Sequence, residues 1–123
     1  MKKIERSNPV KDFVYSEFRK IADKTPFTQI EWAAMLHVSE RTLQRYAKNN
    51  GVFASINAER AMQIANVISE GKKTFGKTEM FYNWLKTNPV MAEGELSLES
   101  LNSAQGIQQV LTQLGRIQYG ILA

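Results

Sequence analysis

Two helix-start signals within 22 residues, in the segment 27–48, constrain this chain more than any other feature. Thr28 is followed three residues later by Glu31, which is a capping box in which each side chain accepts a hydrogen bond from the backbone of the other residue. Ser39 is placed as a second N-cap, and Glu40 behind it suits the positive end of a helix dipole. The segment therefore predicts a helix, a tight turn that contains His37, and a second helix.

The side chains of this segment divide into an apolar and a polar set. Apolar residues recur at helical spacing and are expected to face a core. The second helix carries hydroxyl, amide and basic side chains on its other side, and such groups pair with base edges and phosphates in the major groove of DNA. An ordinary helical hairpin with a solvated basic face is the alternative. The candidate DNA-binding residues are Ser39, Arg41, Thr42, Gln44, Arg45 and Lys48.

The same segment resembles the helix-turn-helix of the Xre/Cro-like repressors. Small Ala33 stands where two helices approach closely, and apolar side chains occupy the family's core positions. The turn residue that is most often glycine in that family is His37 here, so a left-handed histidine is expected. Asn50-Gly51 is expected to end the second helix, with glycine in the left-handed conformation. The residues at the apolar positions are Leu36, Val38, Leu43 and Tyr46.

Charge is distributed unevenly along the chain. Residues 1–75 carry 13 Lys/Arg and 8 Asp/Glu, whereas residues 76–123 carry 3 and 4. The basic excess lies in the half that contains the segment 27–48, as a nucleic-acid-binding face requires. The chain has no cysteine and one histidine, so a metal site, thiol catalysis and a Ser–His–Asp triad are not expected. We therefore expect a cytoplasmic protein that is not an enzyme, has no catalytic residues, needs no cofactor and does not cross a membrane.

Helical periodicity continues on both sides, and no strand-length alternation occurs, so an all-α fold is expected. A first helix is expected from Asn8-Pro9, and a fourth over 57–70 that Gly71 ends. The Gly/Lys-rich segment 71–76 suggests a boundary between a Cro/Xre-like helix-turn-helix domain at 1–75 and a smaller helical domain at 76–123. That second domain is expected to hold a helix at 78–86, a loop at 89–96, a helical turn at 97–101 and a long helix capped by Ser103. Gly106 inside the last helix predicts the close approach of another backbone, and the glutamines of that helix are expected on its solvent side.

The second half carries an ordered series of motifs: Trp84-Leu85, Asn88-Pro89, a leucine-bearing turn, Gly106 and a Leu-Gly-Arg-Ile-x-Tyr-Gly ending. This series is similar to the toxin-binding domain of the Xre/MbcA/ParS antitoxins. With the first half, the chain resembles a whole antitoxin of a RES–Xre type II toxin–antitoxin system. The resemblance implies that the protein binds and inhibits a cognate RES-domain toxin that consumes NAD⁺, and represses its own promoter by binding double-stranded DNA.

The end of the chain is the expected toxin-binding segment. The resemblance assigns Arg116, Tyr119 and Gly120 to it, with Ile117 as a packing residue. The apolar terminus Ile121, Leu122 and Ala123 adds the composition of a protein contact, since chain ends are usually polar unless they are held. Folding of this terminus onto the protein's own core is the alternative.

A stand-alone dimeric helix-turn-helix repressor is the alternative function, because the apolar last helix would also suit a two-fold interface. A homodimer is expected in both cases, since one such module makes few base contacts and operators are usually two-fold. A small enzyme is the third class, and no catalytic constellation in the sequence favours it.

Overall fold

A computed structural model of the protein describes residues 12–120 and confirms the expected all-α fold. Helices dominate this part of the chain, and the strands form one short hairpin. In chain order the elements are α1 (Tyr15–Ala22), α2 (Gln29–Leu36), α3 (Glu40–Asn49), α4 (Ser55–Phe75), α5 (Thr78–Lys86), β1 (Val90–Met91), β2 (Gly94–Glu95), the 3₁₀ helix η2 (Leu98–Asn102) and α6 (Ala104–Gln118).

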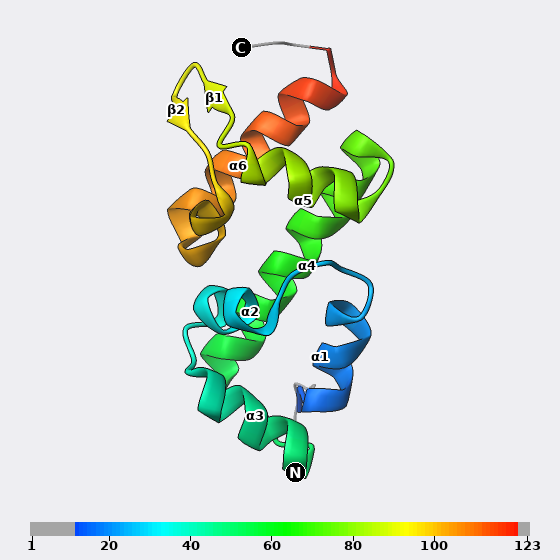
Figure 1. Ribbon diagram of the computed structural model, residues 1–123, viewed down its shortest axis with the longest axis vertical. Coiled ribbons are helices and arrows are strands. Elements are labelled where there is room, and N and C mark those ends of the chain that lie inside the picture. The colour runs from blue at the N-terminus through cyan, green and yellow to red at the C-terminus, as the bar shows by residue number, and fades with distance from the viewer. Residues whose placement is uncertain (1–11, 121–123) are drawn as a thin grey trace, which may run out of the picture.

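The long helix α4 is the axis of the molecule (Figure 1). Helices α1, α2 and α3 lie around its first half, and α5, η2 and α6 lie around its second half, so that α3 and the end of α6 are at opposite ends. The most buried side chains form one continuous cluster along this axis. The fully buried members include Ile64 and Val67 of α4, Phe81 and Leu85 of α5, and Leu101, Val110 and Leu114.

Aromatic rings fill the core around the first half of α4. The ring of Phe18 meets that of Trp32 edge to face with centroids 5.0 Å apart, and the ring of Tyr46 stacks on Phe53 at 4.9 Å. Such pairs add to the burial of apolar area because the edge of one ring is attracted to the face of the other. Trp32 belongs to this core, since 2% of its surface is exposed.

Two helix boundaries differ from the sequence prediction. The proposed start at Asn8-Pro9 lies outside the described residues, and within them α1 begins only at Tyr15, after Val14 has paired with Val52 in an isolated β-bridge. Helix α4 continues through Gly71 and ends at Gly76, which has a φ of 89°. Gly71 lies inside the helix, and packing explains why this residue is a glycine. A Cβ there would lie 2.3 Å from the ring of Phe81.

The expected loop at 89–96 contains a small antiparallel hairpin, in which Val90 faces Glu95 and Met91 faces Gly94. The expected helical turn is present as η2, and the backbone N–H of Gly106 donates to the Ser103 hydroxyl at the start of α6, which confirms that cap (3.0 Å). The close approach predicted at Gly106 is also confirmed, since a Cβ there would lie 1.9 Å from the carbonyl oxygen of Ser100.

Candidate functional site

Helices α2 and α3 are joined by a three-residue turn, as expected for the segment 27–48. The capping box is formed: the N–H of Glu31 donates to Thr28 Oγ1 (3.1 Å), and the N–H of Thr28 donates to Glu31 Oε1 (2.8 Å). His37 ends α2 with φ 60° and ψ 40°, which is the left-handed conformation predicted for it. The helix α3 ends likewise, but at Asn50 (φ 48°) and not at Gly51. Gly51 is needed for space, since a Cβ there would lie 2.6 Å from the Tyr46 ring.

Long-range hydrogen bonds, which no motif in the sequence indicates, hold the turn in place. Asn57 Nδ2 of α4 donates to the carbonyl of Leu36 (2.8 Å), and Arg60 donates to that of Met35 (3.2 Å). These two carbonyls belong to the last turn of α2, which lacks partners within its own helix. His37 Nε2 donates to the carbonyl of Asn102 (2.5 Å), which also accepts from Arg60 (3.2 Å). The turn is therefore fixed by α4 and by the end of η2.

The opposite end of α2 is also held by the second half of the chain. The hydroxyl of Tyr82 in α5 donates to the Glu31 carboxylate, with distances of 3.0 and 3.1 Å to its two oxygens. Burial is the larger of two causes that raise the pKa of the Tyr82 hydroxyl, and this contact with Glu31 is the second. The hydroxyl of Thr78 donates to the carbonyl of Lys24 (3.1 Å). Helix α2 is thus bonded at both ends to segments that follow residue 76.

The outer side of α3 carries the predicted basic and amide side chains. Leu43 faces the core, whereas Ser39 at the start of the helix is exposed and accepts a hydrogen bond from the N–H of Thr42 (3.0 Å). The Ser39 hydroxyl donates to Thr42 Oγ1 (2.9 Å), so both hydroxyls serve the cap. The structure brings the remaining four candidates together on one exposed side of a ten-residue helix: Arg41, Gln44, Arg45 and Lys48.

The end of α6 is the second candidate site. Tyr119 is 82% exposed, and Gly120 has a φ of 74°. Arg116 is tied to the hairpin, where its guanidinium pairs with Glu93 (2.6 Å). Gln118 donates to Glu70 Oε1 (3.1 Å) and to the hydroxyl of Thr74 (2.9 Å), which fixes the last turn of α6 against α4. The remaining candidates Ile121, Leu122 and Ala123 lie outside the described residues.

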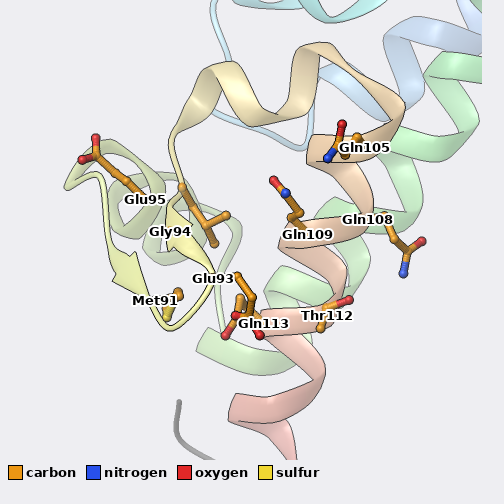
Figure 2. A pocket seen from close by; sticks show the side chains of 10 residues that line it. Met91, Glu93, Gly94, Glu95, Gln105, Gln108, Gln109, Thr112 and Gln113 are labelled. Atoms are coloured by element: carbon orange, nitrogen blue, oxygen red, sulfur yellow. The ribbon is translucent and has the colours of Figure 1, made fainter.

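The hairpin and α6 enclose a groove of about 270 Å³ (Figure 2). The prediction that the glutamines of α6 all face solvent is wrong for Gln113, which is 3% exposed and donates to Glu93 Oε1 (2.6 Å). Because Glu93 receives hydrogen bonds from Arg116 and Gln113, its carboxyl has a pKa below the usual range. A buried amide is tolerated when it is hydrogen-bonded. The groove is also lined by Gln105, Gln108, Gln109 and Thr112.

Within residues 12–120, no group of three or more His, Asp or Glu side chains is placed to hold a metal ion. In the same part of the chain, no helix is both long and apolar enough to cross a membrane.

Comparison of the chain with protein-family models and with curated proteins found no match.

Proposed function

We propose that this protein is the antitoxin of a type II toxin–antitoxin system, which inhibits a RES-domain toxin and represses its own promoter. The observation that carries this proposal is the presence of two exposed sites of different chemistry. They belong to α3 and to the end of α6, which lie at opposite ends of the α4 axis (Figure 1). One is the basic outer side of α3, and the other is the exposed end of α6. Two such sites suit a protein that contacts DNA and a protein partner at the same time.

The DNA-binding part of the proposal is supported by how α3 is presented. Its polar side chains project from a helix whose start is capped by Ser39 and whose preceding turn is fixed by Asn57 and Arg60. A rigidly held helix with arginine and glutamine on its exposed side can enter the major groove, where arginine pairs with guanine and glutamine with adenine. Lys48, and whichever of Arg41 and Arg45 does not read a base, would contact phosphates.

The toxin-binding part is supported by the end of α6 and by the resemblance of the motif series. The ring of Tyr119 is exposed, although aromatic side chains are usually buried in a core or in an interface. The helix that carries it is held rigidly by Gln118, so a partner would meet a preorganised surface. The predicted apolar terminus follows directly.

Arg41→Ala combined with Arg45→Ala tests the DNA-binding face. We expect the affinity for a duplex of the gene's own promoter to fall roughly 10- to 1,000-fold, with a smaller dependence on salt, because two charged contacts are lost. The matched control is Lys73→Ala with Lys86→Ala, which removes the same charge from other helices. Fluorescence anisotropy at several salt concentrations gives both affinities. Equal losses in the two double variants would show that only net charge matters and would refute this face.

Truncation after Gln118 tests the toxin-binding end. Residues 1–118 should bind the promoter duplex as the full chain does, but should not co-purify with a RES-domain toxin encoded beside this gene. Val90→Ala, which alters another exposed apolar residue, is the control and should co-purify normally. If the full chain is a dimer that binds the promoter but does not co-purify with such a toxin, the result would instead support the stand-alone repressor.

A further inference from the structure

A groove of about 630 Å³ lies between α1, α4 and the start of α5, and lysines from separate elements line it. Lys20 belongs to α1, Lys24 follows that helix, Lys72 belongs to α4, and Lys77 immediately precedes α5. Two pairs of lysines that are about 50 residues apart in the sequence are thus brought to one cavity by the fold. We infer that this groove binds a small oligophosphate, either free or as the phosphate chain of a nucleotide.

The lysines of the groove outnumber the carboxylates that could compensate them. Lys20 pairs with Glu17 (Nζ–Oε2 3.1 Å), whereas Lys24, Lys72 and Lys77 form no ion pair with a carboxylate in the described part of the chain. Glu79 is the one carboxylate among the described lining residues. Like charges gathered around one groove repel one another, and a multivalent anion relieves that repulsion. Inorganic and nucleotide oligophosphates carry several negative charges on adjacent groups, which matches this arrangement.

Backbone and hydroxyl donors complement the lysines. Helix α5 begins beside the groove, and its N-cap residue Lys77 supplies no side-chain cap, so N–H groups of the first turn have no partner from that cap. Such groups bind phosphate oxygens, and the helix dipole favours the negative charge. Ser69 lies in the same lining and supplies a hydroxyl. The groove therefore combines ammonium, hydroxyl and amide donors.

The floor and the size of the groove suit a small ligand. Ile68 is 7% exposed and lies in the lining with the half-buried Ile21 and Ala65, so an apolar surface is available beside the charged wall. Pockets for small molecules and cofactors commonly have volumes of about 300–1,000 Å³ and combine such a surface with a few polar groups. A nucleotide would place its phosphates at the lysines and its nucleoside on this floor.

The groove is separate from the DNA-binding face. Asn57 of α4 is bonded to the turn before α3, and Lys72 follows it by 15 residues on the same helix. At a rise of 1.5 Å per residue the two positions are roughly 22 Å apart along α4. We therefore assign the groove to a small oligophosphate ligand and not to the backbone of the DNA that α3 would hold.

Isothermal titration of the full chain with inorganic tripolyphosphate and, separately, with ATP at low salt tests this site. Both probes should bind with a stoichiometry of one, and Lys72→Gln with Lys77→Gln should weaken binding by about tenfold or more. The matched control, Lys73→Gln with Lys86→Gln, removes the same charge outside the groove and should change the affinity less than about twofold. Tighter binding of ATP than of tripolyphosphate would assign the ligand to nucleotides, and equal affinities to free oligophosphate.

Two outcomes would overturn the proposal: neither probe binds the wild-type chain, or the two double variants weaken binding equally. If neither probe binds and Lys72→Gln with Lys77→Gln weakens promoter binding, the lysines are assigned to DNA. Circular dichroism melting of each variant separates lost binding from lost folding, since these exposed substitutions should leave the melting temperature nearly unchanged.

Discussion

Replacing Gly106 by alanine is expected to destabilise the protein, whereas the same replacement at Gly115 is expected to stabilise it. Both glycines lie inside α6, where alanine is favoured over glycine by about 1 kcal/mol. Their surroundings differ. A Cβ at Gly106 would lie 1.9 Å from the carbonyl oxygen of Ser100, and a Cβ at Gly115 would have no neighbour within 4 Å beyond its own helix backbone.

The magnitude at Gly106 follows from the size of the clash. An ordinary C···O contact is about 3.3 Å, so the backbones of η2 and α6 must separate by roughly 1.4 Å. Backbone atoms cannot rotate aside as a flexible side chain does, which places the cost at or above the upper end of the usual overpacking range of about 1–3 kcal/mol. After the gain of about 1 kcal/mol in helix propensity, we expect Gly106→Ala to cost about 2 kcal/mol or more.

Urea unfolding followed by circular dichroism at 222 nm measures both variants under the same conditions. Gly115→Ala should raise the free energy of unfolding by about 0.5–1 kcal/mol, with an unchanged m-value. Gly106→Ala should lower it by about 2 kcal/mol, a fall of several degrees in melting temperature for a chain of this size. Equal effects of the two substitutions, in either direction, would refute the close packing of η2 on α6.

Three further predictions concern contacts between distant segments. His37→Val should lower the free energy of unfolding by about 1–2 kcal/mol in urea titrations, because a β-branched residue tolerates the left-handed conformation poorly. His37→Gly should lower it much less. A His37→Val variant as stable as the wild type would contradict the φ of 60°. Tyr82→Phe should cost about 1 kcal/mol in the same assay through the lost bond to Glu31, and Tyr82→Phe should add no further cost in a Glu31→Ala background if that bond is the cause. Arg116 lowers the folded-state pKa of Glu93, so the stability that the Glu93 carboxylate contributes is present above its unfolded pKa of about 4.3 and is lost as the pH falls through the folded value. Glu93→Gln should therefore lower the free energy of unfolding at pH 6 and make that free energy fall less steeply between about pH 5 and 3. An unchanged profile of stability against pH would refute the ion pair.

Local chemistry made much of α2, α3 and α6 predictable from the sequence. Thr28, Ser39 and Ser103 each cap the helix that follows, and each acts on a backbone N–H three residues away. The left-handed turn at His37 was expected from the resemblance to the Xre/Cro-like helix-turn-helix, in which this position is most often glycine. The side of α3 that is exposed followed from helical periodicity alone.

Features that depend on distant partners could not be read in this way. Gly71 looked like a helix end, because nothing local indicates that the ring of Phe81 occupies the space beside it. Gln113 looked exposed, since its partner Glu93 is 20 residues away on a hairpin that has almost no strand signal. The bonds that Arg60 makes to the carbonyls of Met35 and Asn102 likewise require the fold.

The central claim, that separate ends of one molecule serve a toxin and DNA, is tested most directly by growth of cells that express the toxin encoded beside this gene. When expressed from a foreign promoter, the full chain and the Arg41→Ala, Arg45→Ala variant should both restore growth. The altered residues belong to α3, which lies at the opposite end of the molecule from the end of α6 (Figure 1). Residues 1–118 should fail to restore it. Full rescue by residues 1–118, or no rescue by the full chain, would contradict the account.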